Sequence, residues 1–243
     1  MNISLIIPTY NEDKNIIDLI KKIENNLYNE KINYKIFVID DSPTDVIKDS
    51  IKQFNKTVNF IYRGKKLGRG SAVLEGIKIA LRTEYTDIII EMDADLSHDP
   101  SELNSKIETF LNNDCDLLIS SRYMKKSLIV GWPISRKILS FLSNKLARSF
   151  LKVPVSDYTN GYRFYSKKAA HHIILNCGNI GDGFIVLSEI LLELYLNKFK
   201  LFETDTIFRN RTKGSSSVNL KLIASSLIGL FKLYLIKIKK IKY

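Results

Sequence analysis

The chain has 243 residues, 45% hydrophobic and 26% charged, which is long and apolar enough for a sizeable packed core and excludes global disorder. Its 37 Lys and Arg residues outnumber 26 Asp and Glu residues, giving a formal net charge of +11. Two cysteines, Cys115 and Cys177, exclude a disulfide framework and a four-thiolate zinc site. The charge is uneven, because residues 1–121 are acidic on balance whereas residues 122–168 and 200–243 are strongly basic. This pattern indicates one part that binds a cation and another that meets an anionic partner: nucleic acid, a membrane surface or a phosphorylated substrate.

The first half of the chain alternates strand and helix patterns. Short apolar, β-branched runs predict strands at residues 3–8, 34–39, 58–62, 87–92 and 117–120. Helical periodicity predicts helices between them, at residues 16–27, 46–54, 73–81 and 103–111. Strands separated by helices are typical of a mostly parallel α/β sheet, in which ligands bind beyond the carboxyl ends of the strands. Polar clusters follow four of these strands, at residues 9–12, 40–45, 63–69 and 93–98, so we expect a site at that edge.

The second half is less regular and carries two basic amphipathic helices, predicted at residues 134–151 and 220–240. A further helix is predicted at 185–195 and a strand at 201–208. We expect no signal peptide and no transmembrane helix, since no basic segment precedes the first apolar run and no apolar run reaches about 20 residues. Basic amphipathic helices of this kind lie on membrane surfaces or pack against a core, and Trp132 suits either an interfacial anchor or a packed position.

The most informative motif is Asp93-Ala94-Asp95, which follows a predicted buried strand. Two carboxylates leaving a strand can bind one hard divalent cation such as Mg²⁺ together with substrate phosphates, although an isolated acidic turn is also common. Asp40 and Asp41 end the second strand and could bind a ribose or base, the alternative being a segment that caps the next helix through Ser42 or Asp45. Residues 65–70 precede a helix and offer cations and backbone N–H groups for phosphate, but they match neither a Walker loop nor a dinucleotide fingerprint.

Arginines recur near polar turns in the second half of the chain. The set comprises Arg122, Arg136, Arg163, Arg209 and Arg211. A guanidinium donates two parallel hydrogen bonds to phosphate, and Arg211 opens a Gly/Ser-rich segment that could wrap an anion. His98 could bind a metal, but a hydrogen-bonded turn histidine is the more common situation.

Taken together, the chain resembles the family-two glycosyltransferases of the GT-A fold, and within them the dolichyl- or polyprenyl-phosphate mannosyltransferases. The matching segments run in family order over nearly the whole chain: residues 8–12, 39–43, 66–72, 92–98, 121–123, 131–132, 136–137, 157–165 and 211–216. The resemblance implies an α/β, Rossmann-like catalytic domain over residues 1–218, followed by a basic amphipathic membrane-surface helix over residues 219–243. Ser97 and Ser217 depart from the family pattern, standing where some members have a glutamine and a lysine.

The resemblance also implies a set of site residues. The donor, a nucleotide sugar and most commonly GDP-mannose, would bind Pro8, Tyr10, Glu12, Asp40, Asp41, Lys66, Gly68, Asp93 and Arg211. Asp93 and Asp95 would hold Mg²⁺ or Mn²⁺ on the donor diphosphate. The acceptor phosphate would bind Arg122, Arg136 and Ser140, and Asp95, Arg122 and Arg211 would act in catalysis.

The reaction that the resemblance implies is inverting transfer of a hexose to dolichyl or polyprenyl phosphate. A lipid phosphate is already anionic, so we assign no general base, and Asp157 is a candidate only for a hydroxyl acceptor. We expect a peripheral protein on the cytoplasmic face of a membrane, with room for a small anchoring subunit. The alternatives are UDP-glucose or another donor, a hydroxyl acceptor on a glycan, lipid or protein, and, more remotely, a basic nucleic-acid-binding protein.

Overall fold

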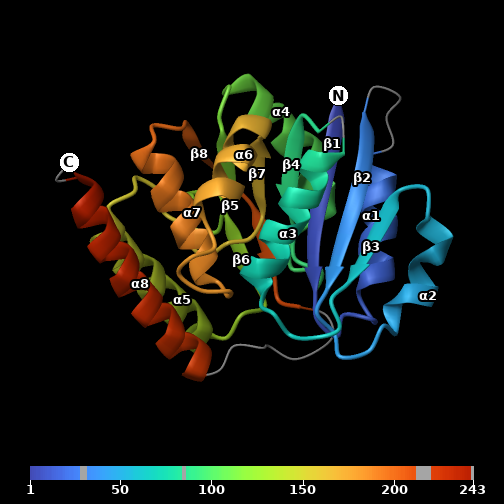
Figure 1. Cartoon of the computed structure of the whole chain (residues 1–243), viewed down its shortest axis with the longest axis horizontal. Helices are drawn as coiled ribbons and strands as arrows, with labels where there is room; N and C mark the ends of the chain where they lie inside the picture. Colours follow the sequence, from blue (N-terminus) through green and yellow to red (C-terminus); the bar gives the residue numbers. More distant parts are fainter. Residues whose placement is uncertain (28–31, 84–85, 212–219, 242–243) are drawn as a thin grey trace.

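In the computed structural model, which describes residues 1–27, 32–83, 86–211 and 220–241, one seven-stranded sheet forms the centre of the molecule (Figure 1). The strands are β1 (Asn2–Thr9), β2 (Asn33–Asp40), β3 (Val58–Tyr62), β4 (Ile88–Glu91), β5 (Leu117–Ser121), β7 (Arg163–Ser166) and β8 (Leu201–Asp205). Their order is β3-β2-β1-β4-β7-β5-β8, and β7 alone runs antiparallel to its neighbours β4 and β5. The predicted mostly parallel sheet is confirmed.

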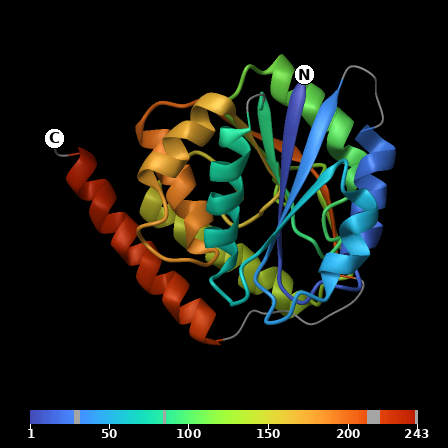
Figure 2. The ribbon, with the colours of Figure 1, turned by 45° about the vertical axis from the view of Figure 1, so that its right-hand side comes forward.

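Helices cover both faces of this sheet (Figure 2). Helices α1 (Ile16–Leu27), α2 (Ile47–Ile51) and α4 (Leu103–Asn112) pack on one face, and α3 (Arg69–Arg82), α6 (Lys167–Asn176) and α7 (Ile185–Leu196) pack on the other. Each face of the sheet has its own hydrophobic core, and β1 contributes to both. Leu5 packs in the core on the side of α1 and α4, and Ile6 packs in the core on the side of α3, α6 and α7. Alternating side chains along a strand point to opposite faces, so a strand buried on both sides is apolar throughout.

Two of the predicted elements are divided in the structure. The predicted helix at 46–54 is the short α2 followed by a 3₁₀ turn, η1 (Lys52–Phe54), and a second 3₁₀ turn, η2 (Pro100–Glu102), precedes α4. The predicted strand at 201–208 divides into β8 and β9 (Ile207–Arg209), and β9 leaves the main sheet to pair with β6 (Leu128–Val130). The polar pair Asp205-Thr206 marks this break in the apolar run.

The two amphipathic helices, α5 (Ile134–Leu151) and α8 (Leu220–Ile241), lie side by side along one edge of the molecule (Figures 1 and 2). Phe150 of α5 meets the ring of Tyr234 of α8 at 5.3 Å, and Lys237 donates a hydrogen bond to the carbonyl of Phe150. Lys240 of α8 also pairs with Glu193 of α7 at 2.6 Å. Helix α8 therefore packs on the domain. The boundary predicted between residues 218 and 219 lies outside the described residues.

Candidate active site

Segments from four neighbouring strands meet at the carboxyl edge of the sheet. Thr9, which ends β1, donates a hydrogen bond to Asp40 at the end of β2 (2.9 Å). Arg63, after β3, pairs with Asp41 at 2.5 Å, and Arg69, at the start of α3, pairs with Asp93 after β4 at 2.6 Å. The four polar clusters of the sequence therefore lie together at the carboxyl edge of the sheet.

Asp93 and Asp95 lie at the centre of this edge. Arg69 donates from Nε and Nη2 to Oδ1 of Asp93, at 2.8 and 2.6 Å. Oδ1 of Asp95 accepts hydrogen bonds from the backbone N–H and the hydroxyl of Ser97 (3.1 and 2.5 Å). Oδ2 of Asp95 lies 3.2 Å from Nη2 of Arg211. Each carboxylate is thus oriented through Oδ1.

These two carboxylates suit a hard divalent cation that is shared with a substrate. Mg²⁺ is usually bound by one or two carboxylates plus substrate phosphates rather than by an all-protein cage. Across the part of the chain that the structure describes, no group of three or more His, Cys, Asp or Glu side chains could hold a metal by itself. Arg211 already places positive charge against Oδ2 of Asp95. The two carboxylates therefore suit a divalent cation whose remaining ligands come from a substrate diphosphate.

The acidic pair at the end of β2 has mainly internal contacts. Asp40 is fully buried, and its Oδ1 accepts hydrogen bonds from Thr9 and from the N–H and hydroxyl of Ser42. Asp41 accepts from Arg63 through Oδ1 and from the backbone N–H groups of residues 67 and 68 through Oδ2 (2.9 and 2.8 Å). In this structure Asp41 shapes the loop before α3.

That loop uses its N–H groups differently from the phosphate cradle that the sequence suggested. The backbone N–H groups of residues 67 and 68 donate to Asp41. Those of Gly70 and Ser71 donate to the carbonyl of Asp182, at 2.8 and 3.2 Å. Gly68 has φ 100°, and a Cβ there would lie 2.5 Å from the same carbonyl oxygen. This close approach explains the glycine. These four amides hold the fold rather than a free anion site.

Tyr10, Glu12 and Lys66 form the remaining part of the predicted donor set. Nζ of Lys66 lies 4.1 Å from the ring centroid of Tyr10, which is 36% exposed. Burial raises the pKa of Glu12 above its ordinary value, and the negative charges of Asp95 and Asp93 raise it further. A hydrogen bond from Asn15 opposes this shift by lowering the pKa. Glu12 therefore lies close enough to Asp95 and Asp93 for their charges to act on it.

On the other side of Asp93, Arg122 forms a buried bidentate pair with Asp157. Nε and Nη2 of Arg122 donate to the two carboxylate oxygens at 2.8 and 2.7 Å, and Nη2 also donates to Thr159. Asp157 accepts further hydrogen bonds from the backbone N–H groups of residues 122, 159 and 160. Burial alone would raise the pKa of Asp157, but the charge and hydrogen bonds of Arg122 lower it below its ordinary value. Asp157 is thus a poor proton acceptor at neutral pH.

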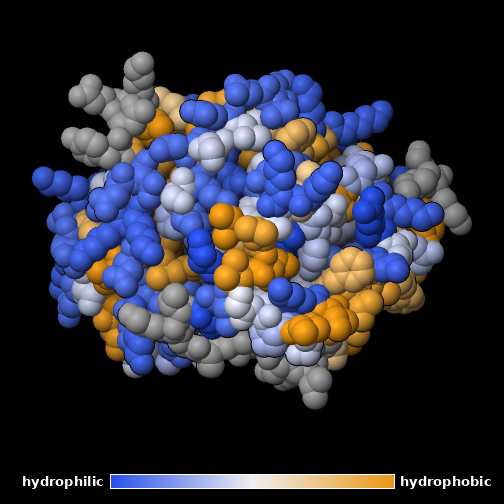
Figure 3. All heavy atoms as spheres, turned by 180° about the vertical axis from the view of Figure 1, so that it is seen from behind, coloured by the Kyte–Doolittle hydropathy of each residue, from blue (hydrophilic) through white to orange (hydrophobic). Residues whose placement is uncertain are grey.

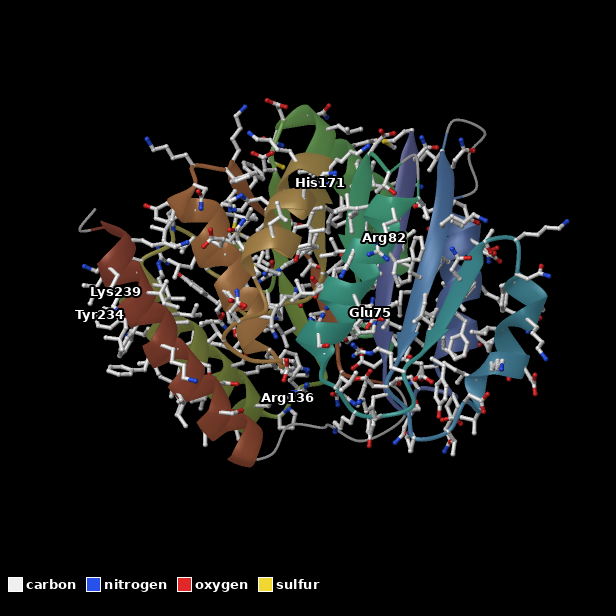
Figure 4. The ribbon with its side chains drawn as sticks, viewed as in Figure 1. Glu75, Arg82, Arg136, His171, Tyr234 and Lys239 are labelled. Atoms are coloured by element: carbon white, nitrogen blue, oxygen red, sulfur yellow. The ribbon has the colours of Figure 1, made fainter. Side chains whose placement is uncertain are left out.

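The other two predicted acceptor residues lie on α5. The guanidinium of Arg136 lies 4.1 Å from the ring centroid of Trp132 and donates to the side chain of Asn210 at 3.1 Å. Burial lowers the pKa of Arg136, and the neighbouring charge of Arg211 lowers it further. Ser140 accepts a hydrogen bond from Tyr123 at 2.7 Å. Figure 4 shows Arg136 at the end of the molecule where the carboxyl edge of the sheet lies.

A cavity of about 280 Å³ connects the carboxylate pair with the predicted acceptor residues. Its polar end is lined by Asp93, Asp95, Ser97, Arg122, Arg136, Ser140 and Arg211. Its other end runs between α5, α7 and α8 and is lined mainly by apolar side chains: Leu139, Leu146, Ala147, Ile185, Leu227 and Leu230. The donor residues predicted before β4 do not line this cavity. The cavity is therefore amphipathic, with cations at one end and an apolar channel at the other.

Several sequence interpretations change at this point. Arg163 is fully buried and donates to the carbonyls of residues 158, 160 and 187, so it holds the fold and cannot reach a phosphate. Arg209 is half exposed and lies 3.8 Å from Asp99. Trp132 is 8% exposed and packs edge-on against Phe208, which resolves it as a packed aromatic.

His98 is the hydrogen-bonded turn residue that the sequence favoured. The N–H of Asp93 donates to Nδ1 of His98 (3.2 Å), so the proton is on Nε2, which donates to Asn160 at 2.9 Å. The sequence reasoning gave no role to Asn160, Glu91 or Gly161, which lie around Asp93 or its partner Arg69. The predicted Gly/Ser-rich loop at 212–216 and Ser217 lie outside the described residues.

Comparison with known proteins shows which family the chain resembles. The model of glycosyl transferase family 2 matches residues 4–174. A dolichol-phosphate mannosyltransferase of Pyrococcus furiosus is 32% identical over 239 residues, which cover 96% of this chain and 64% of that protein. A polyprenol monophosphomannose synthase of Mycolicibacterium smegmatis is 30% identical over 219 residues, covering 88% and 80%. The chain thus spans slightly less than two thirds of the length of the first relative.

Solved structures support the fold. Glucosyl-3-phosphoglycerate synthase from Mycobacterium tuberculosis, in complex with Mn²⁺, UDP-glucose and phosphoglyceric acid, superposes with a TM-score of 0.66 over 95% of this chain and 80% of that chain. At 16% identity this likeness concerns the fold alone, and it confirms the predicted GT-A architecture. With the family match over most of the domain and the two relatives at 30% identity or more, the chain belongs to glycosyl transferase family 2.

Proposed function

We propose that this protein transfers a hexose from a nucleotide sugar to dolichyl or polyprenyl phosphate, with inversion at the sugar carbon. The favoured pair is mannose and GDP-mannose, because both relatives are named for mannose transfer to a polyprenol-type carrier. One observation carries the proposal. A single cavity connects two carboxylates and three arginines to an apolar channel, which matches an acceptor with a phosphate head and a hydrocarbon tail.

The acceptor phosphate would bind at the arginine end. Arg136 and Arg211 bring positive charge into the cavity, and Ser140 offers a hydroxyl beside them. Arg122 stacks near the rings of Trp132 and Phe208, at 5.6 and 5.3 Å, and its pair with Asp157 fixes its orientation. The first isoprene units would then follow the apolar lining between α5 and α8.

The chemistry requires no protein base. An oxygen of the acceptor phosphate, already anionic, forms the new bond to C1 of the sugar, while the bond from C1 to the donor diphosphate oxygen breaks and the nucleoside diphosphate leaves. A single displacement of this kind inverts C1. Asp157, the one carboxylate considered as a base, is saturated by Arg122 and three backbone N–H groups. The saturated Asp157 therefore favours a phosphate acceptor over a hydroxyl acceptor.

Catalysis then depends on positioning and on charge at the leaving group. Mg²⁺ or Mn²⁺ bound by Asp93 and Asp95 would neutralise charge on the departing diphosphate. Arg211 lies 3.2 Å from Asp95, so it could shift from this carboxylate to the diphosphate once the cation binds. Tyr10, Glu12 and Lys66 border the same edge and would hold the nucleoside part of the donor.

The surface around the channel suits a peripheral position on a membrane. The apolar side of α5 points outward rather than into the core: Ile134 is 76% exposed and Leu142 53%. Ile228 and Phe231 of α8 are similarly exposed, at 61% and 54%. Figure 3 shows apolar surface at the centre of this reversed view and at its lower right, the side of α5 and α8. Large exposed apolar patches mark interaction sites, and the exposed lysines on both helices add attraction to anionic lipid.

Across residues 1–27, 32–83, 86–211 and 220–241, no helix combines the length and apolarity needed to cross a bilayer. We place the protein on the cytoplasmic face, where nucleotide sugars are available, and the exposed helices leave room for a small anchoring subunit. No role in nucleic-acid binding is proposed, because the basic helices are also apolar on their exposed side.

The test is a panel of nucleotide sugars, including GDP-mannose and UDP-glucose, incubated with polyprenyl phosphate and Mg²⁺ or Mn²⁺. We expect one donor to give a polyprenyl-phosphate hexose whose anomeric configuration is opposite to that of the donor. The variants Asp93→Asn and Asp95→Asn should lose transfer. Their binding to lipid vesicles is the control measurement and should be unchanged. Efficient transfer to sugar hydroxyls and none to polyprenyl phosphate would overturn the proposal.

A further inference from the structure

Arg69 lies between two acidic side chains, Asp93 and Glu91, and no sequence motif connects these three residues. Its Nε and Nη2 both donate to Oδ1 of Asp93 (2.8 and 2.6 Å), while its Nη1 lies 2.6 Å from Oε1 of Glu91. Oδ2 of Asp93 lies 3.8 Å from Nε2 of His98. Arg69 therefore occupies one oxygen of Asp93, and a cation in the cavity would have to use the other.

Glu91 balances the charge of Arg69. It is fully buried at the end of β4, and its Oε2 accepts a hydrogen bond from the hydroxyl of Tyr165 at 2.7 Å. With one arginine between two carboxylates, the three side chains together keep one negative charge. The positive charge of Arg69 is thus shared between Glu91 and Asp93.

The space for Arg69 depends on Gly161. A Cβ at this position would lie 1.8 Å from Nη2 of Arg69 and 2.7 Å from its Cζ. The backbone of Gly161 is not in the left-handed region that favours glycine, so conformation does not explain the residue. The ring of Phe184 lies 5.6 Å from the guanidinium. Gly161 is therefore best explained by the volume that Arg69 fills.

We propose that Arg69 is a positioning residue for Asp93: it holds Oδ1, Glu91 neutralises its charge, and Gly161 leaves the space for it, so that Oδ2 is presented to the divalent cation. This inference rests on the metal dependence in the proposed function. Partners that orient a metal ligand through its second atom change metal affinity by about 10- to 100-fold when removed. A merely structural ion pair joining α3 to β4 would stabilise the fold but leave metal affinity unchanged.

Charge and positioning make opposite predictions for Arg69. Removal of a positive charge beside a cation site tightens cation binding, whereas loss of the clamp on Oδ1 weakens it. Arg69→Met would leave Glu91 buried without its cation, so the informative variant is Arg69→Met with Glu91→Gln, which restores the net charge of the three side chains to that of the wild type. Glu91→Gln alone keeps the clamp but removes one negative charge.

The experiment measures Mn²⁺ binding to the purified protein by electron paramagnetic resonance, with GDP and with UDP in separate series. We expect the Arg69→Met/Glu91→Gln protein to bind Mn²⁺ about 10-fold or more weakly than the wild type. Glu91→Gln should also weaken binding. Arg82→Met is the control: it removes an exposed arginine of the same helix, and Figure 4 shows Arg82 toward the end of α3 away from Arg136. It should not change Mn²⁺ affinity.

Gly161→Ala provides an independent way to displace Arg69 without removing it, because the clashing group is the end of the Arg69 side chain. It should weaken Mn²⁺ binding by displacing Arg69, and adding it to the Arg69→Met/Glu91→Gln protein should cause no further loss. Wild-type affinity in both Gly161→Ala and the Arg69→Met/Glu91→Gln protein would overturn the inference. If the wild type itself binds no Mn²⁺ with either nucleotide, the proposed metal dependence fails instead.

Discussion

Substitution of Asp157 by Asn provides a quantitative test of the buried pair that orients Arg122. The side chains of Asp157 and Arg122 are 0% and 7% exposed, and Asp157 accepts hydrogen bonds from both side-chain and backbone donors. Removing one partner of a buried ion pair destabilises a protein by about 3–5 kcal/mol, because the other charge stays buried and uncompensated. For a chain of this length we expect Asp157→Asn to lower Tm by roughly 6–20 °C.

The assay is urea denaturation followed by tryptophan fluorescence. Trp132 is the single tryptophan and lies 5.6 Å from the guanidinium of Arg122, so its emission reports directly on this region. Adding Arg122→Met to Asp157→Asn should cause less destabilisation than the two changes summed, because they remove one shared interaction. Asp114→Asn is the control, since it breaks an ion pair with Lys200 whose side chains are mostly exposed, and little change is expected.

The same pair predicts a pH dependence with a definite sign. Because the pKa of Asp157 is lowered in the folded protein, its contribution to stability is complete above the unfolded pKa, about 3.9, and is lost as the pH falls through the folded pKa. The difference in unfolding free energy between wild type and Asp157→Asn should therefore shrink below about pH 4. A destabilisation below about 1 kcal/mol at pH 7 would refute the reasoning. The reasoning would also be refuted if the turnover of Asp157→Asn fell with the pH dependence that is typical of a lost general base.

Three further predictions concern the cavity and its surroundings. Arg136→Met should raise KM for polyprenyl phosphate about 10-fold or more in steady-state kinetics while leaving donor KM within about twofold, and equal effects on both substrates would contradict the acceptor assignment. Ile138→Ser with Leu142→Ser should reduce sedimentation with anionic vesicles, and unchanged sedimentation would argue against α5 as a membrane surface. Chelation of divalent cations should abolish transfer, and added Mn²⁺ or Mg²⁺ should restore it; transfer that persists in chelator would exclude the metal role.

The sequence predicted the positions of β1 to β5 and of the carboxylate pair well because their signals are local. A buried strand such as Ile88–Glu91 is a continuous apolar run, and polar residues such as Asp93 directly after it must fall at the ligand edge. The antiparallel strand β7 was not predicted, because its insertion between β4 and β5 is a long-range pairing that no short motif reveals.

Side-chain partners were harder to predict. Arg122 and Arg163 both belong to the arginine set that the sequence places near polar turns, yet of these two only Arg122 lines the cavity, whereas Arg163 is enclosed by backbone carbonyls. The loop N–H groups before α3 looked suited to phosphate, but Asp41 and the carbonyl of Asp182 take them up. Gly161 gave no signal, because its requirement comes from Arg69, which is 92 positions earlier in the chain (161 − 69).

The measurement that tests the account most directly compares two acceptors of equal chain length, polyprenyl phosphate and the corresponding polyprenol. Each is incubated with the wild-type protein, its preferred nucleotide sugar and Mn²⁺, and the product is identified by mass. A cavity with three arginines at its polar end and a saturated Asp157 predicts transfer to the phosphate and none to the alcohol. Transfer to the alcohol at a comparable rate would contradict the account, because Asp157, the candidate base for a hydroxyl acceptor, is already paired with Arg122 and with backbone N–H groups.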